Sequence, residues 1–336
     1  MSYSKVQFIA HCIHTAPKTL SNEKQEYCGL EKSKDIAERV KLVAKALEAA
    51  KTSKETRQND AATLKIYMMP EFFFRGRTGA YSMDEVQEVV AALQDTVKDP
   101  NEWSHWMFLF GTIIGKSFET RKAGFFERLF GPKYVVDTTK PIEVYNYVLA
   151  QKGGFGNVAG AGPAAAHAVL KEHLSGLDFI KSKKSSGGIE WERVEHPKPA
   201  REAGTASEVQ VKSYDGNSVF SQDGLTFGVE VCLDHAQKRL KSSQGLPAID
   251  IQLVSSCGMS VKDKSIVART GGYIFLCDGY ANYDTDTLGF NSKVRKIGSA
   301  EVDIADTIPL NAGDVQVNQI FARGAGEIRV YEAQSL

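Results

Sequence analysis

The chain has 336 residues, of which 42% are hydrophobic and 24% are charged, a balance typical of a globular protein with a substantial core. Lysine plus arginine equals aspartate plus glutamate, at 41 each, so no net charge favours binding to nucleic acid or to an anionic membrane surface. No apolar run is long enough to cross a membrane, and residues 1–14 lack the pattern of a signal peptide. We therefore expect a cytoplasmic protein that binds neither nucleic acid nor membrane.

The first part of the chain alternates short apolar runs with amphipathic ones. Strands are predicted at 5–13, 64–69, 106–115 and 142–151. A helix is predicted at 34–50, where Ile36, Val40 and Val43 fall on one face, and another from Asp84 to Asp99. A polar loop is expected at 15–32.

The second part begins with an irregular stretch, which contains a Gly/Ala-rich loop at 153–166 and a charged loop at 181–188. A hairpin is predicted around Asp223-Gly224, and a helix near His235. Further strands are predicted at 249–256, 272–280, 297–303 and 326–332, with a helix at 262–271. This order predicts an α/β fold with helices covering mixed sheets, in which one unit is used twice and residues 1–336 form one domain.

Five cysteines are widely spaced, and no CxxC pair occurs among them. Their odd number and their spacing argue against a disulfide framework and against a structural zinc site. Cys12, Cys257 and Cys277 lie within or at the end of apolar runs, so we expect them to be buried, whereas Cys28 lies in a polar segment.

Glu71 follows a predicted buried strand and precedes three phenylalanines in MMPEFFFRG, residues 68–76. A carboxylate among aromatic rings loses solvation, which raises its pKa and makes it a useful proton acceptor near neutral pH. An ion pair of Glu71 with Arg75 or Arg77 at the strand end is an equally good interpretation of these residues alone.

Lys171 lies among apolar residues in HAVLKEHLSGLDF, residues 167–179. Taken alone, it is best interpreted as an ordinary solvated lysine on an amphipathic segment. The alternative is a partly buried ammonium group that stabilises negative charge on a substrate oxygen.

Cys232 ends the apolar run FGVEV and is followed by Leu233, Asp234 and His235. Alone, it is more typical of a packed thiol in the core than of a nucleophile. At a turn from strand to helix, however, a thiol would have backbone N–H groups beside it to bind an oxyanion. A Cys-His pair with His235 fits poorly, because His235 lies three residues on, at an expected helix start.

Together and in this order, the three stretches resemble the motifs of the nitrilase superfamily, the carbon–nitrogen hydrolases. PEFFF resembles its acidic motif, VLKEHLS its lysine motif and GLTFGVEVCLDHA its cysteine motif. Further similarity covers KVQFIAHC, FLFGTIIG, VYNYVLAQKGG with Asn146, and DIQLVSSCG, so that the resemblance extends over about residues 5–302. It implies a four-layer α-β-β-α sandwich with two mixed β-sheets.

The resemblance also implies a mechanism. Glu71 would be the general base and acid, Cys232 the nucleophile that forms a thioester, and Lys171 with the N–H of Leu233 the oxyanion site. No metal or cofactor is implied. A second acidic residue is expected near the lysine, for which the candidates are Asp178, Glu190 and Glu192, and His235 is expected near the pocket.

The chain departs from compact members of this family in several places. Ala268-Arg269-Thr270 differs from the family pattern after the Arg-Ala pair, and the segments at 116–141 and 181–213 are longer. Lys152 is a second candidate for the lysine, but its Lys-Gly-Gly context indicates a turn. The expected substrate is a small amide, with a nitrile as the alternative. The resemblance also implies a homodimer or larger homo-oligomer, and a non-catalytic binding scaffold is the competing interpretation.

Overall fold

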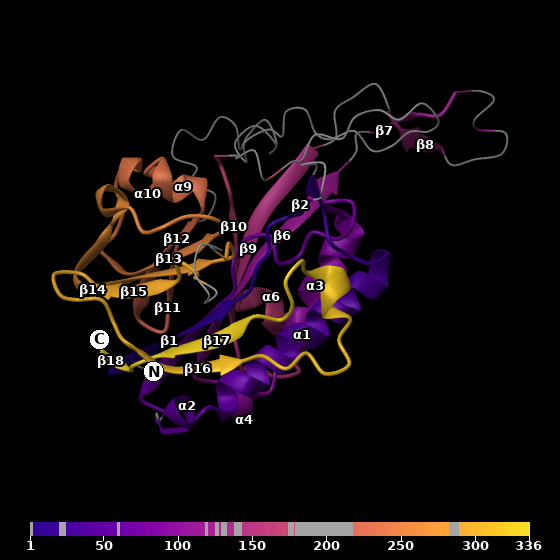
Figure 1. Ribbon diagram of the computed structural model, residues 1–336. Helices are drawn as coiled ribbons and strands as arrows, with labels where there is room; N and C mark the ends of the chain where they lie inside the picture. Colours follow the sequence, from indigo (N-terminus) through magenta and orange to yellow (C-terminus); the bar gives the residue numbers. More distant parts are fainter. Residues whose placement is uncertain are drawn as a thin grey trace.

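Two mixed β-sheets pack face to face, and helices cover the outer face of each sheet (Figure 1). The computed structural model describes residues 3–19, 25–58, 61–117, 120–124, 128, 133–137, 143–173, 178, 218–281 and 289–336. The architecture is therefore the α-β-β-α sandwich with two mixed sheets that the resemblance implied.

The large sheet has nine strands, with parallel pairing in its centre and antiparallel pairing on both flanks. Its main spatial order is β10 (Ala166–Leu170), β9 (Glu143–Lys152), β6 (Trp106–Ser117), β4 (Thr63–Met68), β1 (Lys5–Cys12), β17 (Glu327–Tyr331) and β16 (Ile304–Pro309). Strand β18 (Gln334–Ser335) pairs with β1, and β5 (Tyr81–Ser82) pairs with β6.

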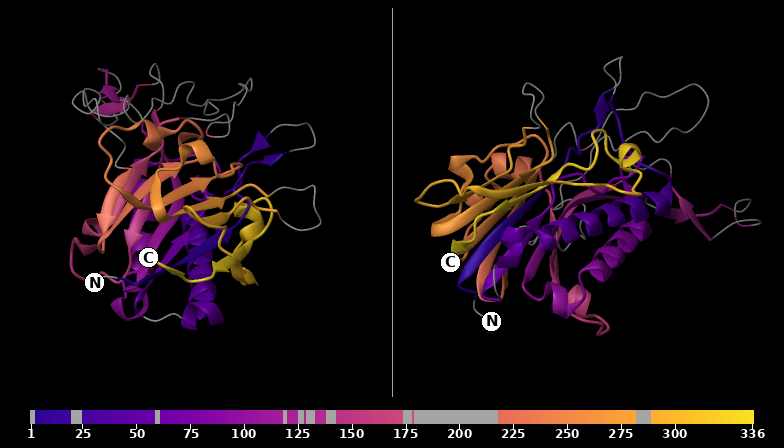
Figure 2. Two further views of the ribbon diagram at one scale, coloured as in Figure 1. Left: turned by 90° about the vertical axis from the view of Figure 1, so that its left-hand side faces the viewer. Right: turned by 60° about the horizontal axis from the view of Figure 1, so that its bottom comes forward.

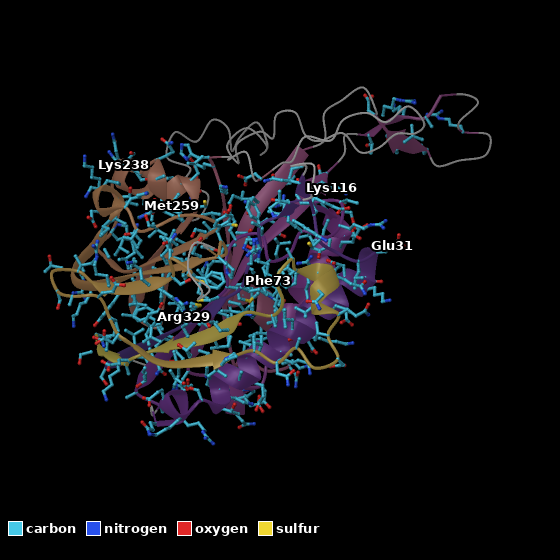
Figure 3. The ribbon with its side chains drawn as sticks, viewed as in Figure 1. Glu31, Phe73, Lys116, Lys238, Met259 and Arg329 are labelled. Atoms are coloured by element: carbon cyan, nitrogen blue, oxygen red, sulfur yellow. The ribbon has the colours of Figure 1, made fainter. Side chains whose placement is uncertain are left out.

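The small sheet has five strands and the same pattern of parallel centre and antiparallel edges. Its order is β11 (Val219–Gln222), β12 (Leu225–Val231), β13 (Ile249–Ser256), β14 (Ala268–Asp278) and β15 (Lys293–Lys296). The repeated pattern agrees with the prediction that one unit is used twice. In Figure 3, Met259 lies on the side of this sheet, whereas Phe73 lies on the side of the large one.

The longest helices among the described residues, α1 (Lys32–Thr52) and α3 (Met83–Thr96), lie on the outer face of the large sheet (Figure 2). The smaller elements are α2 (Lys54–Gln58), α4 (Pro100–Trp103), α6 (Ala161–Ala164), α9 (Leu233–Ala236), α10 (Arg239–Ser242), α11 (Val317–Ile320), the 3₁₀ turn η1 (Asp263–Ser265) and two short hairpins, β2 (Lys18–Thr19) with β3 (Gln25–Glu26) and β7 (Thr120–Lys122) with β8 (Tyr134–Val136). None of the helices in the described ranges is both long and apolar enough to cross a membrane.

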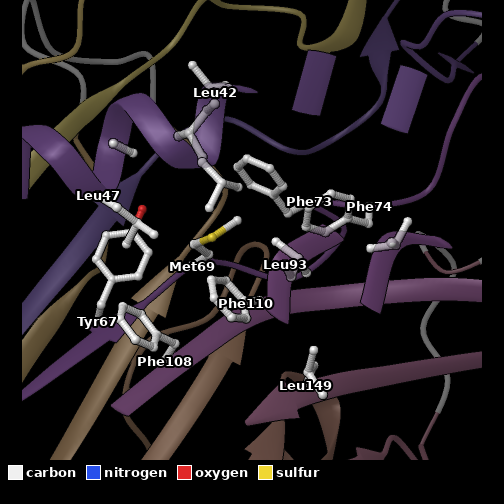
Figure 4. Close-up of a cluster of buried hydrophobic side chains, with 14 of the residues drawn as sticks. Leu42, Leu47, Tyr67, Met69, Phe73, Phe74, Leu93, Phe108, Phe110 and Leu149 are labelled. Atoms are coloured by element: carbon white, nitrogen blue, oxygen red, sulfur yellow. The ribbon is translucent and has the colours of Figure 1, made fainter. Parts of the chain in front are cut away.

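The alternation of side chains along each strand separates two apolar layers. In β1, Phe8 points toward the small sheet, where its ring lies 5.3 Å from that of Phe275, whereas Ile9 packs on the helix side. The helix-side layer also holds Phe73, Phe108 and Phe110 (Figure 4). Because both faces of the central strands are buried, their sequences are nearly continuous apolar runs.

Two predicted elements are corrected by the structure. The helix expected at 262–271 is wrong: only η1 forms, and β14 begins at Ala268. The strands expected at 297–303 are also wrong, since β15 ends at Lys296 and β16 begins at Ile304. The helix predicted from Asp84 begins one residue earlier at Met83, because Ser82 and Glu85 form a capping box with bonds in both directions.

Candidate active site

Glu71 lies in a tight turn just beyond the end of β4. The turn is joined to the small sheet, because the Glu71 N–H donates to Ser256 O at 3.3 Å and Ser255 Oγ donates to Met69 O at 3.1 Å. Phe72 adopts a φ of 65°, a conformation that a residue with a side chain rarely adopts, and its N–H donates to Thr112 Oγ1 at 2.8 Å. The Glu71 side chain is thereby held at the edge where strands of both sheets end, and it is buried.

Lys171 follows β10 and lies between two carboxylates. Its Nζ donates to Glu71 Oε1 at 2.8 Å and to the Asp178 oxygens at 2.8 and 2.7 Å. All three side chains have zero exposure, which makes this a buried cluster of one ammonium group and two carboxyl groups. The ordinary solvated lysine considered for Lys171 is therefore excluded.

Asn146 on β9 is the fourth member of this cluster. Its Nδ2 donates to Glu71 Oε1 at 2.9 Å and to Asp178 Oδ1 at 2.8 Å, and its backbone oxygen accepts from the Lys171 N–H at 2.8 Å. Asn146 thus fixes both carboxylates and the lysine backbone at once. Its role as a site residue was not predicted, although a polar side chain within a buried strand is a signal that could have indicated it.

Cys232 lies at the turn from β12 into α9, as predicted for a nucleophile. Its φ of 43° and ψ of −104° are unusual for a residue with a side chain, and its N–H donates to Ser255 O at 2.9 Å. The residue is buried, with only 7% of its surface exposed. Leu233 is the first residue of α9, where backbone N–H groups have no acceptor within the helix.

The pKa values of Glu71 and Cys232 show that the two side chains influence each other. The pKa of Glu71 is raised to about 7, because burial and the charge of Asp178 raise it more than Lys171 and the Cys232 thiol lower it. Burial and the Glu71 charge raise the pKa of Cys232 well above its ordinary value, whereas the Lys171 charge and the Cys257 N–H lower it. Cys232 therefore rests as a thiol beside a carboxyl group that changes charge near neutral pH.

Lys171 remains charged in this setting. Burial lowers its pKa, but the charges of Glu71 and Asp178 outweigh burial, and the net pKa is raised. Glu71 Oε2 accepts no hydrogen bond of ordinary geometry from the described residues, so this oxygen is available to a proton donor.

Asp178 is the acidic candidate that the structure brings to Lys171; Glu190 and Glu192 lie outside the described residues. The backbone oxygen of Asp178 accepts from Arg75 Nη2 at 2.7 Å, and the Arg75 guanidinium stacks on Phe72 with 4.4 Å to the ring centroid. This arginine contact, which joins the Glu71 turn to Asp178, was not predicted from the sequence.

Arg77 and Lys152, two alternatives considered in the sequence, each contact residues other than Glu71. Arg77 pairs with the exposed Glu31 at 2.9 Å rather than with Glu71. The second candidate lysine, Lys152, lies 3.7 Å from Asp223 and donates to Ser104 O, so it belongs to a different part of the fold.

His235 belongs to a separate buried network. Its Nδ1 lies 2.6 Å from Glu230 Oε2, and its Nε2 accepts from the Lys262 N–H at 3.0 Å, so Nδ1 carries the proton. Gln252 joins Glu230 from the neighbouring strand at 2.8 Å. With both ring nitrogens engaged, His235 supports the turn that carries Cys232 and has no nitrogen left for substrate binding.

The described residues contain no group of three or more His, Cys, Asp or Glu side chains arranged to hold a metal ion. The cluster at Lys171 can instead perform proton transfer and bind a negative oxygen, because it combines a carboxyl group of raised pKa with a fixed ammonium group.

No family model and no curated protein matches the chain. Several solved structures resemble it at low sequence identity. Nit3 of Saccharomyces cerevisiae, a member of branch 10 of the nitrilase superfamily, is 14% identical, with 99% of this chain and 90% of that chain covered and a TM-score of 0.44. An amidase from Nesterenkonia sp. is 12% identical, with 98% of this chain and 90% of that chain covered and a TM-score of 0.41.

Proposed function

We propose that the chain is a carbon–nitrogen hydrolase of the nitrilase superfamily that cleaves a small amide through a thioester on Cys232. The observation that carries the proposal is the buried contact of Lys171 with Glu71 at 2.8 Å beside the Cys232 turn. A buried base, a fixed cation and a thiol at a strand-to-helix turn are the groups that acyl transfer requires.

In the first half of the reaction, Cys232 Sγ attacks the amide carbon while its proton passes to Glu71. The Glu71 pKa of about 7 suits this transfer, since the carboxyl group can accept and release a proton near neutral pH. The negative oxygen of the tetrahedral intermediate is held by Lys171 Nζ and the N–H of Leu233. Glu71 then returns the proton to the departing nitrogen, which leaves as ammonia or an amine.

In the second half, water replaces the amine in the same position. Glu71 takes a proton from the water, the resulting hydroxide adds to the thioester carbon, and the C–S bond breaks. The Cys232 sulfur recovers a proton from Glu71, and the carboxylic acid product leaves. One carboxyl group thus acts twice as base and twice as acid.

Asp178 is proposed to keep Lys171 charged and oriented rather than to transfer protons. Both of its oxygens lie within 2.8 Å of Lys171 Nζ, and Asn146 donates to it as well. An ammonium group has three N–H donors. Three carboxylate oxygens already accept from it, so a substrate oxygen can bind Lys171 only where the two Asp178 oxygens share one N–H, which restricts that oxygen to one position.

The test is ammonia release from a panel of small amides, nitriles and carbamoyl compounds, with Cys232→Ala as the control. We expect the highest rates with amides and none in the variant. Activity that survives the substitution would exclude the thioester. A preference for nitriles would favour the alternative substrate class.

A non-catalytic scaffold is tested separately by alkylation with iodoacetamide. We expect Cys232 to be labelled well ahead of Cys12, Cys257 and Cys277, three thiols that are at most 3% exposed. Equal labelling of all four would favour the scaffold. The expected homodimer is tested by sedimentation of the full chain.

A further inference from the structure

Asp234 lies two residues beyond Cys232, and its buried carboxylate contacts the chain segment that carries Lys171. Oδ1 accepts from the Glu172 N–H at 3.1 Å and from the His173 N–H at 2.7 Å, and Oδ2 lies 3.2 Å from the Glu172 nitrogen. The His173 ring adds Nδ1 at 2.9 Å from Oδ1. Asp234 therefore joins α9 to the residues directly after Lys171.

Lys171 is consequently held on both sides of its own backbone. On one side its N–H donates to Asn146 O on β9 at 2.8 Å. On the other side, the N–H groups of the next two residues, Glu172 and His173, donate to the Asp234 carboxylate. β10 belongs to the large sheet, whereas α9 directly follows β12 of the small sheet, so these hydrogen bonds join the two halves of the sandwich.

A second contact strengthens the same junction. Arg239 on α10 lies 3.2 Å from the Glu172 carboxylate and 4.0 Å from that of Asp234. Glu172 and Arg239 are buried, with side-chain exposures of 8% and 2%. A buried carboxylate that meets two backbone N–H groups and a nearby guanidinium has its charge well compensated, so it forms a fixed support rather than a mobile one.

We propose that Asp234 is a positioning residue that sets the placement of Lys171 relative to Cys232. It belongs to the helix that begins directly after Cys232, and it binds the two residues directly after Lys171. Any movement of Lys171 relative to Cys232 must therefore break the hydrogen bonds of Asp234. The inference rests on the proposed function for its catalytic meaning, but its geometry is independent of the substrate.

The test is a double-mutant cycle that combines Asp234→Asn with Lys171→Gln. Asparagine has the same shape but keeps only one oxygen acceptor and carries no charge. The readout is the rate of Cys232 alkylation by iodoacetamide, followed by mass spectrometry of the Cys232 peptide in the full chain. This rate needs no substrate turnover, so it remains measurable even if no amide is hydrolysed, an outcome that would count against the proposed function alone.

We expect Asp234→Asn to slow alkylation at least about 10-fold in the wild-type background, because a misplacement of about 1 Å in a reactive site costs up to about 10²-fold. In the Lys171→Gln background the same substitution should cost less than about threefold, since Asp234 acts through Lys171. His173→Ala is the matched control: it removes the ring contact, keeps both backbone donors, and should stay within about threefold of wild type.

Equal losses in both backgrounds would overturn the proposal, because a purely structural effect does not depend on Lys171. A rate for Asp234→Asn within threefold of wild type would overturn it as well. If that variant does not unfold cooperatively on heating, Asp234→Ser, which keeps a hydroxyl acceptor, takes its place in the same cycle with the same expectations.

Discussion

Replacement of Glu71 by glutamine should make the protein progressively more stable than wild type as the pH rises. The Glu71 carboxyl group has zero exposure, and burial, as the main cause, raises its pKa from 4.5 to about 7. Between these values the folded chain keeps a proton that the unfolded chain releases. The free energy of unfolding of the wild type therefore falls as the pH rises from 4.5 to 7 and is constant with respect to this group outside that range.

The size of the effect follows from the two pKa values. A pKa that differs by one unit between two states corresponds to about 1.4 kcal/mol. Most of the range from 4.5 to about 7 lies between pH 5 and pH 8, so the wild type should lose about 2 to 3 kcal/mol there through Glu71. Glutamine does not titrate, and its amide oxygen can still accept from Asn146 and Lys171.

The assay is urea unfolding of both proteins at pH 5 and pH 8, with the change in unfolding free energy compared between them. Other titrating groups cancel in this difference. Glu88→Gln on the exposed side of α3 is the matched control and should give the same difference from wild type at both pH values. If the advantage of Glu71→Gln were constant or smaller at pH 8, the assignment of a raised pKa to Glu71 would be refuted.

Three further predictions concern the same site. Lys171→Met should lower the free energy of unfolding by about 3 to 5 kcal/mol in urea titrations, because it leaves two buried carboxylates unpaired; a loss below 1 kcal/mol would contradict the buried cluster. The kcat/KM for an amide should rise with pH to a midpoint near 7, where Glu71 becomes able to accept the thiol proton, and a midpoint near 4.5 would exclude it as the base. His235→Gln should cost about 1 to 3 kcal/mol of stability through its lost bond to Glu230, yet leave iodoacetamide labelling of Cys232 within about threefold; loss of labelling would point to a Cys-His pair.

The buried strands could be predicted from the sequence because their apolar runs have few alternatives. The strand predicted at 249–256 has the same bounds in the structure. The predicted hairpin around Asp223-Gly224 forms between β11 and β12. The helix at 262–271 could not be excluded in this way. Its residues from Ala268 onward belong instead to β14, which pairs with β13. There Gly272 approaches Asp250 O so closely that a Cβ would lie 2.4 Å away, and this pairing is a tertiary contact that local propensity does not contain.

The residues of the candidate site also fall into those that the sequence could indicate and those that depend on contacts between distant segments. Taken alone, Glu71, Lys171 and Cys232 each allowed or favoured a structural interpretation, and they became candidates because their three stretches, in this order, resemble the motifs of one family. The choice of Asp178 over the other acidic candidates was not possible, since it depends on a contact between separate segments of the chain. The same holds for Asn146, whose side chain meets Glu71 75 residues away in sequence. His235 shows the converse, because a neighbour in sequence points into another network.

The backbone conformation at Cys232 lowers the stability of the fold. At φ 43° and ψ −104°, this position would suit a glycine better than any residue with a Cβ, and such conformations cost about 1 to 3 kcal/mol. Cys232→Gly should therefore raise the melting temperature of the protein and abolish the proposed hydrolase activity. Variants selected for heat resistance alone would be expected to lose the thiol first. A screen that scores only stability would discard the residue on which the proposed chemistry depends.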